Sequence, residues 1–169
     1  MYFFKTLSIA AIVLGAVSNA VPLIEPQEDI SLAARGAGPS KPSACTLDAA
    51  LAAASVKSLR GNALFYTGVS LPKVQAVQKK SGRKSILDVF PATVRDELQV
   101  LCHKSGGDAW AIMSQAMAEL ASGETWVLKT TPGHAGGTYW NMEYNVMAQH
   151  RQVTLYRVDE AGAKVEHLL

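Results

Sequence analysis

The chain has 169 residues, of which 49% are hydrophobic and 18% are charged. Sixteen Lys and Arg against 14 Asp and Glu leave a formal net charge of +2 at pH 7, which gives no support to a nucleic-acid binder that works by charge alone. The hydrophobic share is ample for a packed core and excludes a wholly disordered chain, and the length fits one domain.

The first 20 residues have the composition of a secretion signal. Lys5 precedes an apolar run over 7–17, and Ser18-Asn19-Ala20 places small residues before a cleavage point. A membrane anchor is the alternative, but the run has about 11 residues where a spanning helix needs about 20. We therefore expect a secreted, extracellular protein without a membrane span. Residues 21–44 are rich in Pro and Gly, which predicts a mobile leader or linker before a domain over 45–169.

The mature chain contains two cysteines, Cys45 and Cys102. In an exported chain two cysteines make one disulfide, so we expect this pair to be bonded. The bridge would close a loop of about 58 residues, worth about 3–4 kcal/mol in the chain-entropy treatment. Two separate buried thiols are the alternative. Cysteines so far apart predict no metal site.

Capping residues and hydrophobic patterning predict helices that alternate with strands. In chain order we expect helices over 46–60, 70–80, 91–103 and 108–121, and extended segments over 63–67, 85–90, 124–129 and 152–158, with a loop and a short segment around 139–147. Gly123 is expected to close the fourth helix. The pattern predicts an α/β fold, with helices packed on a small mixed or parallel sheet whose strand ends carry the site.

The sequence has no phosphate loop, serine-hydrolase elbow or zinc motif. Three other segments carry the candidate functional residues. Tyr66-Thr67 ends the first predicted strand, Trp110 and Ser114 share one helix face, and Glu143 lies in aromatic surroundings. Each has an ordinary alternative: a core tryptophan, a serine bonded to a backbone carbonyl, and a carboxylate that reaches water or an arginine.

These segments resemble the C-terminal half of the ADP-ribosyl cyclase / NAD glycohydrolase family, in particular its small secreted or toxin-type members. The resemblance spans roughly 64–158 and is strongest from Trp110-x-x-x-Ser114 through Trp126-Val-Leu to Glu143 and the strand Val153-Thr-Leu. It implies the following roles: Glu143 as the catalytic glutamate, Trp110 as a pocket tryptophan, Ser114 as a phosphate-contacting serine, Tyr66 with Thr67 at a second aromatic position, and Asp88 as a retained acidic residue.

The family's chemistry suits these residue types. Breaking the nicotinamide–ribose bond of NAD produces an oxocarbenium-like centre, which a carboxylate such as that of Glu143 stabilises. Trp110 and Tyr66 would sandwich the nicotinamide ring, and the loop over 133–137 would donate to the diphosphate. NAD is then the substrate, with no metal and no bound cofactor. The basic group over 79–84 is either a second diphosphate contact or, more in keeping with its place at a helix end, a solvated surface.

Two positions depart from the animal enzymes of the family: Gln115 replaces an arginine and Leu87 replaces a glutamate. They favour the alternative of a secreted, non-catalytic effector or binding module on the same fold. A small secreted ribonuclease that pairs Glu143 with His134 or His150 is the third reading, which the near-zero charge disfavours. For an active enzyme we expect mainly nicotinamide and ADP-ribose, with some cyclic ADP-ribose, because Leu87 and the smaller Tyr66 hold the returning adenine less well.

Overall fold

The computed structural model describes residues 40–150 and 152–169. The predicted signal and residues 21–39 of the predicted leader lie outside the described residues. Within the described ranges, no helix is long and apolar enough to cross a membrane. The helices are α1 (Leu47–Ala53), α2 (Leu71–Ser81), α3 (Ile86–Val89), α4 (Ala92–Ser105), α5 (Ala109–Leu120) and α6 (Thr138–Gln149), and the strands are β1 (Leu59–Arg60), β2 (Leu64–Tyr66), β3 (Ala121–Leu128), β4 (Val153–Val158) and β5 (Lys164–His167).

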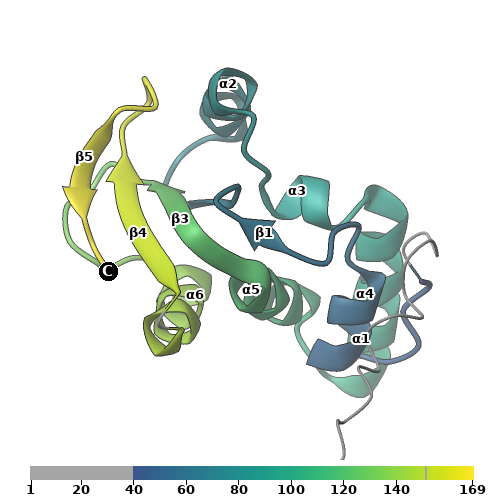
Figure 1. The fold of residues 1–169 in the computed structure, drawn as a ribbon. Coiled ribbons are helices and arrows are strands. Elements are labelled where there is room, and N and C mark those ends of the chain that lie inside the picture. Colours follow the sequence, from purple (N-terminus) through teal and green to yellow (C-terminus); the bar gives the residue numbers. More distant parts are fainter. Residues whose placement is uncertain (1–39, 151) are drawn as a thin grey trace, which may run out of the picture. The chain divides into compact units, whose positions relative to one another are not determined.

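The five strands form one mixed sheet around β3, which confirms the predicted α/β class (Figure 1). β4 runs parallel to β3 on one edge, and β5 adds to β4 in the antiparallel sense. On the other edge β3 pairs first with β1 and then with β2, both parallel, with Leu59 opposite Ala121 and Leu64 opposite Trp126. The carboxyl ends of β2 and β3 therefore coincide, since Tyr66 lies opposite Leu128.

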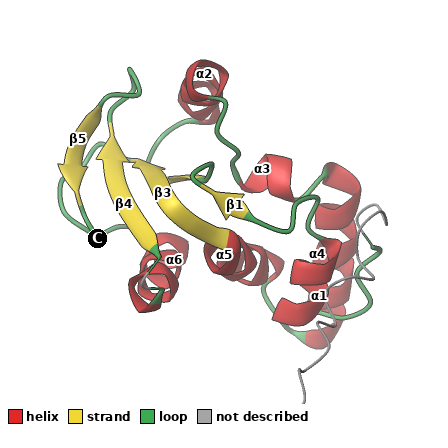
Figure 2. Cartoon of the chain, in the orientation of Figure 1, coloured by secondary structure: helices red, strands yellow, loops and turns green. Residues whose placement is uncertain are grey.

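Helices cover both faces of the sheet (Figure 2). The larger core lies on the face covered by α5 and α6, where Met113, Met117 and Leu155 are fully buried. A smaller core under α2 contains Val74 and Val77, which pack with strand residues of the opposite face. Alternation along β3 and β4 supplies apolar side chains to both layers, as a sheet buried on two faces requires.

Two predicted elements were wrong, the first because long-range contacts override local preference and the second because a local capping signal was missed. The helix expected over 46–60 ends at Ala53, since the chain must turn to place Leu59 in parallel register with β3, where it is fully buried. The segment expected to be extended over 85–90 contains the short helix α3 instead. A capping box between Ser85 and Asp88 starts it, which satisfies two backbone N–H groups reciprocally.

Three further features differ from expectation at the C-terminal half. α5 ends at Leu120 and the chain enters β3 directly, so Gly123 does not close the helix; it lies within the strand with a φ of 64°. The short segment around 139–147 is a full helix, α6. The strand β5 was not predicted, because its residues carry no hydrophobic run.

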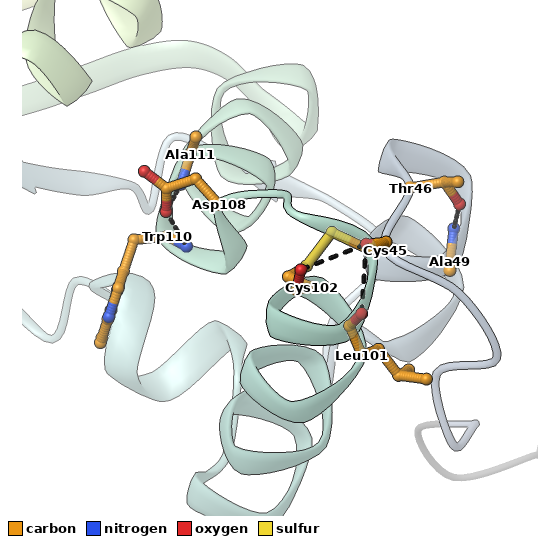
Figure 3. The surroundings of a disulfide bond; sticks show 9 residues. Cys45, Thr46, Ala49, Leu101, Cys102, Asp108, Trp110 and Ala111 are labelled. Atoms are coloured by element: carbon orange, nitrogen blue, oxygen red, sulfur yellow. Dashed lines mark hydrogen bonds between the residues drawn. A yellow bond between two sulfur atoms is a disulfide. The ribbon is translucent and has the colours of Figure 1, made fainter.

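The predicted disulfide between Cys45 and Cys102 is present (Figure 3). It joins the residue before the Thr46 cap of α1 to the last turn of α4. Gly107 packs directly against it: a Cβ on Gly107 would lie 2.7 Å from the Cys45 sulfur, so no side chain fits there. The bridge thus contacts the connection between α4 and α5.

Candidate active site

A cavity of about 130 Å³ opens at the carboxyl end of β2 and brings the three predicted segments together. Its lining comes from β2, α3, α5 and the first half of α6. The lining residues are Leu64, Phe65, Tyr66, Thr67, Ile86, Trp110, Ser114, Met117, Gly137, Tyr139, Trp140 and Glu143. Five of the six predicted binding or catalytic residues therefore share one cavity, and Asp88 is the exception.

Local sequence explains how α5 presents two of these residues. Asp108 caps the helix, with its carboxylate accepting from the backbone N–H groups of Trp110 (2.9 Å) and Ala111 (3.2 Å), as Figure 3 shows. Trp110 and Ser114 are four residues apart, and both side chains consequently reach the cavity from one helix face. Ser114 is buried, whereas Trp110 remains partly exposed at the edge.

Glu143 is the buried acid of the cavity, with only 6% of its surface exposed. Burial raises its pKa to about 8, partly opposed by a hydrogen bond from Ser114, which favours the charged form. At neutral pH the carboxyl group is therefore mostly protonated, and a nearby positive charge would promote its ionisation. An acid whose pKa is strongly perturbed inside a cavity is a candidate for a functional position.

Tyr66 lies within the electrostatic reach of Glu143. The pKa of its phenol is raised first by burial and then by the charge of Glu143, while Arg95 on α4 acts in the opposite sense. The phenol consequently stays neutral and can donate a hydrogen bond. Neighbouring Thr67 accepts a hydrogen bond from the backbone N–H of Gly137 at 3.3 Å, which joins the end of β2 to the start of α6.

Aromatic side chains frame the cavity. Trp140 is fully buried and packs tilted against Phe65, with ring centroids 6.4 Å apart. Tyr139 is 42% exposed, and its hydroxyl donates to the Asp108 carboxylate at 2.9 Å. This bond links the start of α6 to the start of α5 beside Trp110.

A buried lysine, Lys129, which the sequence analysis did not single out, holds the loop between β3 and α6 by hydrogen bonds. The ammonium group of Lys129 donates to the backbone carbonyls of Gly133 (2.8 Å) and Ala135. Burial removes water from the ammonium group and thereby lowers the pKa of Lys129. The two carbonyls and the nearby ring of Trp140 take the place of that water. A Cβ on Gly136 would lie 2.2 Å from Trp140, so the close approach of loop and indole requires glycine there. Only the tertiary fold reveals this anchor.

Asp88 lies outside the cavity lining. Its carboxylate accepts from the backbone N–H of Ser85 at 2.8 Å and from the side chain of Gln78, and it caps α3. The structure thus gives Asp88 a local capping role in place of the substrate contact that the resemblance implies.

The remaining candidate groups are also engaged elsewhere. The Arg83 guanidinium of the basic group lies 4.0 Å from the ring of Trp126 and pairs with Glu124 at 2.7 Å. The His134 ring stacks on Tyr144, and His150 pairs with Glu119 at the far end of α5 and α6. None of these side chains lines the cavity.

Across residues 40–150 and 152–169, no group of three or more His, Cys, Asp and Glu side chains could hold a metal ion. No family model, curated protein or solved structure matches the chain.

Proposed function

We propose that the chain is a secreted NAD glycohydrolase, which cleaves the nicotinamide–ribose bond of NAD with water to give nicotinamide and ADP-ribose. The observation that carries this proposal is a protonatable carboxyl group, Glu143, buried in an aromatic cavity beside Ser114. The composition of the first 20 residues, which predicts a secretion signal, and the disulfide support export.

The cavity suits one end of this substrate. Its volume of about 130 Å³ is below that of sites which enclose a whole drug-sized ligand, so it accepts one ring and leaves the rest outside. The nicotinamide ring of NAD carries a positive charge, which would lower the pKa of Glu143 and ionise it as the ring enters. Trp110 and Tyr66 supply aromatic walls that exclude water from the ring.

The reaction then follows from charge. As the carbon–nitrogen bond breaks, the bonding electrons go to nicotinamide and the positive charge moves onto the ribose. The Glu143 carboxylate stabilises this charge, and Ser114 holds the carboxylate through its hydrogen bond. Water captures the ribosyl cation and releases a proton, which yields ADP-ribose.

A non-catalytic binding module on the same fold is the second candidate, and one observation favours it. Leu87, where the animal enzymes of the family that the sequence resembles carry a glutamate, packs against the hydrophobic core. The cavity thus has a single acidic residue, Glu143. A module of this kind would bind the ring without turnover.

Incubation of the purified mature chain with NAD separates the two candidates. We expect release of nicotinamide, with ADP-ribose as the main second product on chromatography. Glu143→Gln should lower kcat by at least about 100-fold with little change in KM, because the amide keeps the shape but lacks the charge. The matched control is Glu119→Gln, whose carboxylate pairs with His150 away from the cavity. Absence of nicotinamide release from the wild-type chain would overturn the proposal.

A further inference from the structure

Arg95 is a partly buried cation whose guanidinium is held in place by backbone carbonyls. It lies in the first turn of α4, and its Nη1 donates to the carbonyls of Phe90 at 2.9 Å and Leu87 at 3.3 Å, at the end of α3. Among the described residues these are its hydrogen-bond partners, and both involve the same nitrogen. An arginine has five N–H donors, so donors remain for a ligand.

The charge of Arg95 is not balanced in the described part of the chain. Arg83 and Arg157, the other partly buried arginines there, each pair with a glutamate at 2.7 Å. No carboxylate of the described residues lies within 4.0 Å of the Arg95 guanidinium. The first turn of a helix is also where the helix dipole disfavours a cation. An anion from solution would relieve both costs.

Arg95 lies close to the cavity without lining it. α3, whose last carbonyls hold the guanidinium, contributes Ile86 to the cavity wall. The positive charge of Arg95 favours the ionised form of the Tyr66 phenol, which lines the cavity. The guanidinium is therefore held by the same short helix that forms part of the cavity wall, and the proposal below places the rest of the substrate on that side.

We propose that Arg95 binds the diphosphate of the substrate and thereby selects phosphorylated nicotinamide nucleotides over phosphate-free nicotinamide riboside. The inference rests on the proposed function, which sets the ring in the cavity. A guanidinium fixed at one nitrogen presents its remaining donors as a fork, which suits two phosphate oxygens. Leu87 contributes to this selectivity indirectly, because a carboxylate at that position would compete with the substrate for Arg95.

The test compares two substrates that share the nicotinamide–ribose bond. For Arg95→Gln we expect KM for NAD to rise about 10- to 100-fold, while cleavage of nicotinamide riboside changes less than about twofold. Arg95→Lys should recover part of the affinity, because it restores charge but not the fork. Arg60→Gln, which removes an exposed arginine on β1, is the matched control and should behave as wild type. Equal losses on both substrates, or an unchanged KM for NAD, would refute the role of Arg95.

A binding measurement keeps this test separate from the proposed function. Calorimetry, which needs no turnover, measures the affinity for inorganic pyrophosphate. The wild-type chain should bind it, and the affinity of Arg95→Gln should be lower by at least about 10-fold. If the wild-type chain binds pyrophosphate in this Arg95-dependent way but does not cleave NAD, the proposed function fails and the anion site stands. If NAD is cleaved and pyrophosphate binds both proteins equally, the anion site fails alone. Thermal unfolding of each variant checks that it is folded.

Discussion

Glu143→Gln should stabilise the protein at neutral pH, because the buried carboxyl group destabilises the folded state whenever the unfolded chain would ionise it. The folded-state pKa of Glu143 is about 8, against an ordinary value of 4.5. A raised acid pKa contributes stability that is present below pH 4.5 and lost as pH rises towards 8. Glutamine keeps the size and a hydrogen-bonding oxygen for Ser114 but never ionises.

The size of the effect follows from the pKa difference. Each pH unit between the two pKa values costs about 1.4 kcal/mol. At pH 7 the carboxyl group of Glu143 therefore destabilises the folded state by about 3 kcal/mol relative to pH 4.5, and above pH 8 by about 5 kcal/mol. A glutamine at this position lacks that pH-dependent loss. The advantage of the variant should grow by these amounts as pH rises.

Urea unfolding followed by tryptophan fluorescence measures this difference. We would compare wild type, Glu143→Gln and the control Glu119→Gln at pH 4.5, 7 and 8.5 with the disulfide intact. The difference in unfolding free energy between wild type and Glu143→Gln should change with pH, whereas the control should follow wild type. A difference that stays constant from pH 4.5 to 8.5 would show that Glu143 ionises normally in the folded protein, and the reasoning about its burial would be wrong.

Two further predictions concern pH and the disulfide. In the proposed reaction the ionised form of Glu143 supports the ribosyl cation, so kcat/KM for NAD should rise with pH through an apparent pKa near 8, and a flat profile from pH 5 to 9 would contradict this. Replacing Cys45 and Cys102 together with alanine should lower the unfolding free energy by about 3–4 kcal/mol in urea titrations. Thiol labelling of the purified, unreduced wild-type protein should find no reactive cysteine, and two labelled cysteines would show that Cys45 and Cys102 are not bonded to each other.

The sequence predicted the positions of those cavity residues whose placement depends on neighbouring residues in the chain. The Asp108 cap and helical spacing were enough to place Trp110 and Ser114 on one face, and the end of a short apolar strand was enough to place Tyr66. The sequence has two cysteines, so one pairing within the chain had to be considered. Convergence of these segments in one cavity follows from the parallel pairing of β2 with β3, which the alternation of helices and strands anticipates.

Features that depend on distant partners could not be predicted. Leu59 forms a strand because Ala121 lies beside it in the fold, although the local sequence favours helix. The capping box between Ser85 and Asp88 is local, but the additional bond from the Gln78 side chain on α2 to the Asp88 carboxylate depends on the fold. A lysine is expected at the surface, and only the fold shows that Lys129 is buried under the loop whose Gly133 carbonyl it contacts. In each case the sequence shows the residue type but not its neighbours.

The disulfide and the buried acid of the cavity have opposite effects on the free energy of unfolding. Glu143 costs about 3 kcal/mol at pH 7, which is a large share of the 5–15 kcal/mol that a domain typically has. The Cys45–Cys102 bridge offsets a similar amount, and it packs on the Gly107 connection that leads into α5, the helix that carries the hydrogen-bond partner of Glu143 (Figure 3). A destabilising carboxyl group persists where function requires it and the surrounding structure compensates. Removal of the disulfide should therefore lower the free energy of unfolding by a similar amount at every pH, and the least stability should remain at the pH values where Glu143 ionises.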